Sequence, residues 1–153
     1  MQAVMITIAD ITSADWSLAL DTPNQPGSGL GQVMQGIADV NQCIQIILTT
    51  PKGSDPLRPT FGADLWQFID YPIDAAIPAI VREVTEAITL WEPRVTLVRV
   101  TAGAAADGTS QSGAHIGINV IWRLSLGKAG TAVPPLTAAQ TTTIMLPAPR
   151  GVG

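Results

Sequence analysis

The feature that most constrains this chain is a long period-two alternation in its C-terminal third. Large apolar side chains recur at every second position from 116 to 126, and His115 falls on the opposite face. Because successive side chains of a strand point to opposite faces, this pattern predicts a strand with one buried face. The segment 95–101 is apolar on both faces and predicts a second strand. The two are expected to pair as an antiparallel hairpin around a turn within 102–112.

Two segments have helical periodicity. From Gly36 to Thr49 apolar residues recur on one face, and polar residues, including Asp39 and Gln42, occupy the expected solvent face. A second amphipathic helix is expected to begin at the N-cap Asp74 and to end at Trp91, because Pro93 cannot continue it. Two helices and a hairpin predict an α+β fold, with a small antiparallel or mixed sheet and both main helices packed on one of its faces.

The chain is expected to form one domain followed by a tail. Residues 16–20 alternate and predict an N-terminal strand, whereas 21–35 are dense in turn-forming residues and predict a long loop. After Gly127 the chain has four prolines and many Ala and Thr residues. The expected organisation is therefore an α+β domain over 1–127, with its core at 36–126, and an extended tail over 128–153. The tail is either a disordered terminus or an arm that adds a strand to a neighbouring subunit.

Charge is scarce in this sequence. Charged residues make up 13% of the 153 residues, hydrophobic residues make up 46%, and the net charge is −4. An acidic chain with so few cations cannot neutralise many phosphates, so nucleic-acid binding is not expected. A surface this poor in charge is typical of a subunit that neighbours largely cover.

Composition also limits the possible sites. One cysteine, Cys43, and one histidine, His115, cannot supply a structural zinc site, and no phosphate-binding or calcium-binding loop is present. No cofactor or metal is therefore expected. The apolar runs are too short to span a bilayer, and the N-terminus lacks a basic segment ahead of an apolar stretch, so neither membrane insertion nor a secretory signal is expected.

Nucleophilic catalysis finds no support, since His115 lies on the outer face of a strand without a serine motif. Glycoside hydrolysis needs only two carboxylates. The candidate carboxylates are Asp64, Asp70, Glu83, Glu86 and Glu92. Most are interpreted as a solvated helix face. The expectation is a protein that is not an enzyme, with a peptidoglycan-cleaving glycosidase that uses Glu92 or Asp64 as its acid as the alternative.

The tripeptide Glu92-Pro93-Arg94 follows the second helix. A carboxylate at a helix C-terminus opposes the helix dipole, so a compensating partner is expected. Proline extends the backbone, which places Glu92 and Arg94 on the same side as a rigid acid–base pair. This pair could clamp a partner through bidentate contacts, or it could form an internal salt-bridged cap.

The segment Arg58-Pro59-Thr60-Phe61-Gly62 is similar in character. A stiffened extended stretch carries one arginine and one aromatic ring, and Gly62 can adopt the positive φ that turns the chain. It lacks an acid, a base or a nucleophile. We therefore interpret it as an interface or core-anchoring loop, with Arg58, Phe61 and Gly62 as candidate partner-binding residues beside Glu92, Pro93 and Arg94.

These two motifs, in this order and spacing, resemble the baseplate assembly protein W family of contractile-tailed phages, whose relatives occur in tailocins and type VI secretion. The resemblance covers roughly 36–126. It implies a structural wedge subunit with a fold similar to the tube-proximal domain of the sheath subunit. It also implies six copies in a ring around the tube, located in the virion tail baseplate and assembled in the host cytoplasm.

The resemblance further implies the partners. Glu92 and Arg94 would contact the helical core bundle of larger wedge proteins, and Arg58, Phe61 and Gly62 would shape the loop beside it. The first ring of sheath subunits would attach by β-strand addition, and the tube or hub is a further partner that the resemblance leaves open. The family has also been labelled lysozyme-like, a label that the carboxylates of this sequence support little. Whether the system is a phage or a secretion apparatus stays open.

Overall fold

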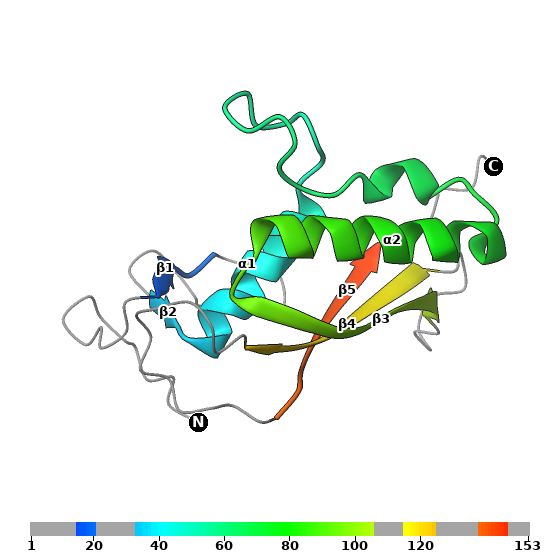
Figure 1. Ribbon diagram of the computed structural model, residues 1–153. Coiled ribbons are helices and arrows are strands. Elements are labelled where there is room, and N and C mark those ends of the chain that lie inside the picture. Colours follow the sequence, from blue (N-terminus) through cyan, green and yellow to red (C-terminus); the bar gives the residue numbers. More distant parts are fainter. Residues whose placement is uncertain (1–14, 21–32, 106–114, 125–137, 147–153) are drawn as a thin grey trace.

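The computed structural model describes residues 15–20, 33–105, 115–124 and 138–146 (Figure 1). The helices are α1 (Ile37–Thr49) and α2 (Ile73–Trp91), with a short 3-10 helix at Leu65–Phe68 between them. The strands are β1 (Trp16–Leu18), β2 (Val33–Gln35), β3 (Val95–Ala105), β4 (His115–Leu124) and β5 (Gln140–Leu146). The expected α+β class is confirmed.

A three-stranded antiparallel sheet with the order β3-β4-β5 forms one layer. The expected hairpin is confirmed, with Val95 of β3 opposite Leu124 of β4. The register shifts between Leu97 and Arg99, which marks a β-bulge at Val98. One extra residue in a strand reverses the alternation of faces. The bulge therefore lets both Leu97 and Val100 pack against the core while Val98 is exposed.

The third strand corrects the expected domain boundary at residue 127. All seven residues of β5 pair with β4, from Gln140 opposite Trp122 to Leu146 opposite Ile116. The Trp122 indole N–H donates to the Thr142 hydroxyl over 2.9 Å, and that hydroxyl is also hydrogen-bonded to Asn41 of α1. Residues 140–146 thus belong to the domain and are not part of an extended tail. The remainder of 128–153, apart from 138–139, lies outside the described residues.

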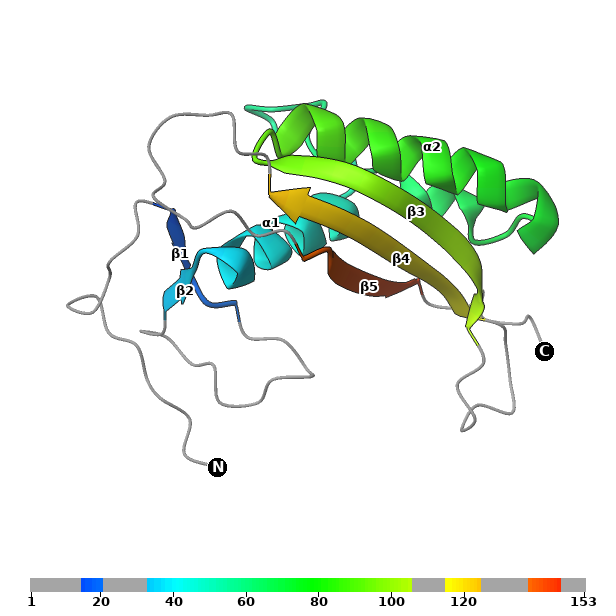
Figure 2. The same cartoon turned by 60° about the horizontal axis from the view of Figure 1, so that its bottom comes forward.

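Both helices cover one face of this sheet, as expected (Figures 1 and 2). The core between the layers consists mainly of buried aliphatic side chains, with one tryptophan from β4. Its fully buried members include Ile44, Leu48, Leu65, Ile80, Ile88, Ile118 and Trp122. The opposite face of the sheet is exposed at Asn119 and Thr143. The sheet therefore has one packed face and one open face, as antiparallel sheets commonly do.

The start of α2 differs from the expectation. The helix begins at Ile73, its N-cap is Pro72, and Asp74 lies in the first turn without a capping hydrogen bond. A negative charge there still favours the helix dipole. Pro78 lies inside the helix, beyond its first turn. In the described part of the chain, no helix is long and apolar enough to cross a bilayer.

A second, two-stranded ribbon pairs β1 with β2, so Trp16 lies opposite Gln35. The expectation of a loop over 21–35 is wrong for Val33–Gln35, because three residues are too few to show a period. The ribbon lies beside the N-terminal part of α1 (Figures 1 and 2). There the Gln42 amide donates to the Ser17 hydroxyl and to the Leu18 carbonyl. The supposed solvent face of α1 is therefore partly buried.

Candidate functional site

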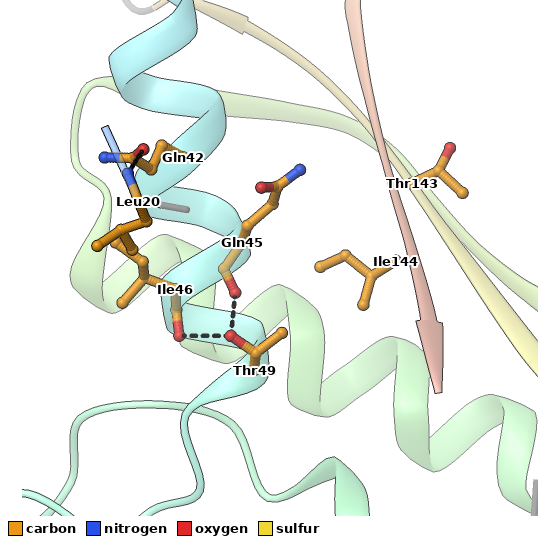
Figure 3. A pocket seen from close by; sticks show the side chains of 7 residues that line it. All are labelled: Leu20, Gln42, Gln45, Ile46, Thr49, Thr143 and Ile144. Atoms are coloured by element: carbon orange, nitrogen blue, oxygen red, sulfur yellow. Dashed lines mark hydrogen bonds between the residues drawn. The ribbon is translucent and has the colours of Figure 1, made fainter. Parts of the chain in front are cut away.

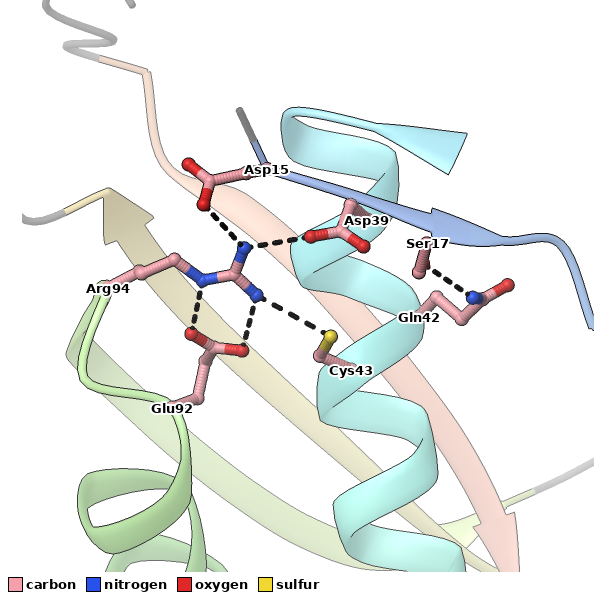
Figure 4. Close-up of polar contacts among 7 residues, drawn as sticks. All are labelled: Asp15, Ser17, Asp39, Gln42, Cys43, Glu92 and Arg94. Carbon is pink, nitrogen blue, oxygen red and sulfur yellow. Dashed lines mark hydrogen bonds and ion pairs between the residues drawn. The ribbon is translucent and has the colours of Figure 1, made fainter. Parts of the chain in front are cut away.

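The Arg94 guanidinium lies at the centre of an ionic cluster that joins three parts of the chain (Figure 4). Its Nε and Nη2 donate to the two carboxylate oxygens of Glu92 over 2.6 and 2.8 Å. Its Nη1 donates to Asp39 Oδ2 of α1 over 2.8 Å and lies 3.6 Å from Asp15 Oδ1. Nη2 also lies 3.5 Å from Cys43 Sγ. We call these five residues the Arg94 cluster.

The Arg94 cluster is largely buried inside the domain. Glu92 and Asp39 are each only 3% exposed. The hydrogen bonds to Glu92, against the opposing effect of burial, raise the pKa of Arg94 above its usual value, and the bond to Asp39 adds to the rise. Burial and the nearby Asp39 and Glu92 charges raise the pKa of the Cys43 thiol. The bidentate pair is thus an internal contact, which corresponds to the salt-bridged cap and not to the partner clamp among the two expected alternatives.

The end of α2 explains why this pair is needed. The Glu92 N–H donates to the Ile88 carbonyl, so Glu92 terminates the helix, and the Val95 N–H donates to the Glu92 carbonyl. Without a cation, a carboxylate at this position would oppose the helix dipole. Arg94 supplies that cation two residues later. A direct contact between Glu92 and a partner would therefore require this cluster to open.

The loop that follows α1 is closed by Gly62. The Ala63 N–H donates to the Thr50 carbonyl over 2.9 Å, which brings the backbone of the loop onto the end of α1. Gly62 has a φ of 103°, and a Cβ there would lie 2.1 Å from the Thr50 oxygen. Only glycine fits this close approach. Gly62 is itself buried, so it shapes the site and does not present a side chain.

Two residues of the same loop stack against the end of α2. The Arg58 guanidinium carbon lies 4.8 Å from the centroid of the Phe61 ring, a cation–π arrangement. The Phe61 and Trp91 rings make an edge-to-face contact with centroids 5.2 Å apart. The Trp91 indole N–H donates to the Thr60 carbonyl. The loop that carries Arg58 and Phe61 is thus packed against the C-terminal end of α2.

Glu83 of α2 contacts both ends of this loop and corrects the expectation of a solvated helix face. It is 8% exposed, it forms an ion pair with Lys52, and it accepts the Asp64 N–H over 3.1 Å. Burial would raise its pKa, but the hydrogen bonds from Lys52 and Asp64 hold the pKa of this carboxyl below its usual value. Glu86 matches the expectation, since it is exposed on the surface of α2.

A groove brings the two sequence motifs together. It has a volume of about 400 Å³ and its lining is mostly apolar, with two arginines and one carboxylate. The lining residues are Cys43, Ile46, Ile47, Arg58, Phe61, Trp91, Glu92, Pro93 and Arg94. Five of the six expected partner-binding residues belong to it, and the sixth, Gly62, supports it from within. We call this feature the motif groove.

Sequence reasoning missed the α1 side of this site. Asp39 and Cys43 lie one turn apart on α1 and contact Arg94, whereas the helical pattern predicts a solvent-facing Asp39. The available signal was charge balance: an arginine two residues after a carboxylate at a helix end needs further acidic partners if it is buried. Asp15 follows only from the N-terminal ribbon, which the sequence did not place.

Two of the candidate carboxylates, Glu92 and Glu83, are engaged in internal hydrogen bonds. Both oxygens of Glu92 accept hydrogen bonds from Arg94, and the backbone of Asp64 donates to Glu83. The side chain of His115 lies outside the described part. No group of acidic, histidine and cysteine side chains within the described ranges could hold a metal ion.

The fold and the site define a small α+β domain in which two helices cover one face of an antiparallel sheet and a groove lies beside a buried ionic cluster. Comparison with known proteins identifies the family. Residues 34–126 match the family model described as baseplate wedge protein gp25. The chain therefore belongs to this family of baseplate wedge proteins, and the expected resemblance is confirmed.

Individual relatives agree with this assignment. Baseplate protein W of Escherichia phage P2 is 35% identical over 79 residues, which cover 51% of this chain and 69% of that protein. A chain in the post-contraction baseplate of pyocin R2 is 30% identical, with a TM-score of 0.50 over 63% of this chain and 92% of its own. The crystal structure of a putative tail lysozyme from Geobacter sulfurreducens is similar in fold, at 24% identity and a TM-score of 0.58, over 74% of this chain and 91% of its own.

Proposed function

We propose that this protein is a structural, non-enzymatic subunit of a contractile-tail baseplate wedge, and that the motif groove seats it on the helical core bundle of larger wedge proteins. The observation that carries the proposal is the convergence of two sequence motifs on one groove. Family membership supplies the wedge context. The groove supplies a surface on which a helix could pack.

The lining of the motif groove suits a helical partner. Phe61, Trp91 and Ile46 offer apolar surface, while Arg58 and Pro93 are exposed at its rim. An amphipathic helix buries its apolar face in such grooves, and rim charges set its orientation. The Arg94 cluster would not contact this partner directly. Its internal contacts would hold the segment after α2 in place, so that Pro93 is exposed to the partner.

The wider assembly is part of the same proposal. Relatives come from a phage and from a pyocin baseplate, so we place this chain in the tail baseplate of such a particle, assembled in the host cytoplasm. We propose a ring of six copies, with the tube or hub as a further neighbour. The first ring of sheath subunits would attach by adding strands to the sheet of this protein, because exposed sheet edges are templates for pairing.

Arg58→Glu tests the role of the groove, with Arg82→Glu as its control. Arg58 lines the groove, whereas Arg82 is exposed on α2 and lies 3.7 Å from Glu86. Surface ion pairs contribute little, so both variants should fold with stabilities within about 1 kcal/mol of the unaltered protein. We expect Arg58→Glu alone to lower incorporation into wedges co-expressed with the larger wedge proteins. Equal incorporation of the two variants would contradict the proposal.

A peptidoglycan-cleaving glycosidase is the competing function. The Geobacter sulfurreducens protein is described as a putative tail lysozyme, and its likeness to this chain is one of fold. Loss of turbidity of a cell-wall suspension with purified protein would test it. Activity that disappears in Glu92→Gln while the thermal unfolding transition is retained would replace our proposal with this one. A secretion apparatus in place of a phage would share the structural mechanism.

A further inference from the structure

The sheet has two edge strands that differ in their protection against strand addition. Natural sheets guard exposed edges with charged residues, prolines and bulges. β3 carries the bulge at Val98 and the charge of Arg99. β5 has the sequence Gln-Thr-Thr-Thr-Ile-Met-Leu, with no charge, proline, glycine or bulge. Its threonines and its isoleucine are typical strand formers.

A second groove lies directly beside β5. It runs between β5 and α1 and has a volume of about 250 Å³ (Figure 3). Its lining contains amides, hydroxyls and aliphatic side chains but no charged group. The lining residues are Leu20, Gln42, Gln45, Ile46, Thr49, Thr143 and Ile144. This volume is below the range typical of small-molecule sites and suits individual side chains. We call it the strand groove.

The outer edge of β5 and the strand groove beside it together suit an incoming strand. In an antiparallel pair, alternate backbone groups of a strand point away from its partner, and among the described residues no strand pairs with the outer edge of β5. A strand added to that edge would direct every second side chain toward α1, into the strand groove. An uncharged lining accepts apolar or small polar side chains there and penalises charges.

We infer that β5, and not β3, is the edge that accepts the strand of a neighbouring sheath subunit. The incoming segment is extended and uncharged, and its alternate apolar side chains enter the strand groove. This inference rests on the sheath attachment proposed above and adds the acceptor edge and the chemistry of the occupant.

Two matched substitutions distinguish the edges. Thr143 of β5 and Thr101 of β3 are both exposed, and both lie opposite Asn119 of the central strand. Thr143→Lys places a guarding charge on one edge, and Thr101→Lys places it on the other. The measurement is the fraction of assembled baseplates that carry sheath, counted by electron microscopy. We expect Thr143→Lys to lower it by about tenfold or more, and Thr101→Lys to leave it near that of the unaltered protein.

A second pair tests the groove itself. Thr49→Lys introduces a charge from α1 into the strand groove, and Thr85→Lys is its control on α2. Each threonine is exposed and donates to the carbonyl four residues earlier. Sheath loss with Thr49→Lys but not with Thr85→Lys supports an occupied groove. Equal sheath attachment in both variants would overturn this part of the inference.

Each outcome separates the inference from the function on which it rests. Sheath loss with Thr101→Lys alone would assign the edge to β3 and overturn the inference while strand addition survives. No loss with either edge variant would reject strand addition itself. The amount of this protein in the same wedges reports separately on the motif groove. A photo-crosslink at Met145 that captures a second copy of this chain, and not a sheath segment, would overturn the stated occupant.

Discussion

At the residue scale, Arg94 holds the framework of the site together. One guanidinium contacts three carboxylates, two of them almost fully buried, from segments far apart in the chain. Such a cluster is costly to bury and is tolerated only when its hydrogen bonds are complete. In the described residues no buried side-chain nitrogen or oxygen lacks a partner. The cluster therefore specifies how the corner after α2 sits on α1.

Arg94→Ala should destabilise the domain strongly. The substitution leaves the buried carboxylates of Glu92 and Asp39 without their cation, and removing one partner of a buried pair costs about 3–5 kcal/mol. Urea denaturation followed by circular dichroism measures the loss. Arg82→Ala is the control, since that side chain is 77% exposed. Equal costs for the two substitutions would contradict the role of the cluster.

Glu83 makes stability depend on pH. Its pKa in the folded protein is below the unfolded value of about 4.3, so its contribution is fully present above that value and is lost as pH falls through the folded pKa. The difference in unfolding free energy between the unaltered protein and Glu83→Gln should therefore shrink as pH is lowered from about 5 toward 3. Urea denaturation at several pH values measures it. A difference that stays constant or widens would contradict this assignment.

The six candidate residues show which features of the site could be predicted from the sequence. Proline stiffening and helix-end electrostatics identified Glu92 and Arg94 as a pair in need of partners, and the glycine rule identified the turn at Gly62. The direction in which the pair faces could not be read, because it depends on Asp39 and on a ribbon whose strand β2 has three residues. Rules that use only neighbouring residues therefore predicted which residues form the site. They did not predict that the Glu92–Arg94 pair faces α1.

At the element scale, the helices and the β3–β4 hairpin follow from periodicity. β5 was missed because its seven residues include three consecutive threonines between segments rich in Ala and Pro. Only pairing with β4 makes it a strand. Once paired, its inward residues Thr142, Ile144 and Leu146 complete the core. Tertiary context decided this element, as is common for short strands.

Neighbouring residues of β5 test whether it belongs to the domain. Ile144 is 6% exposed and Met145 is 56% exposed. Ile144→Ala should cost about 2–5 kcal/mol by leaving a cavity, and Met145→Ala should cost less than about 0.5 kcal/mol. Thermal and chemical unfolding of the two variants provide the comparison. If both substitutions were neutral, these residues would be a tail and not a strand.

At the scale of the whole molecule, the two grooves lie on either side of α1. Ile46 lines both of them, so the motif groove and the strand groove are separated by a single helix. One surface is proposed to face the wedge bundle, and the other is proposed to accept sheath. A low-charge surface is consistent with neighbours on several sides. The protein would thus connect the wedge bundle to the sheath through a single small domain.

The most direct test of the central claim is an electron-microscopy structure of the assembled tail at side-chain resolution. We predict a helix of a neighbouring wedge protein seated in the motif groove against Phe61, Trp91 and Pro93, with the Glu92–Arg94 pair still bound to Asp39. A motif groove that faces solvent in the intact particle, or an Arg94 cluster opened to bind a partner directly, would contradict this account.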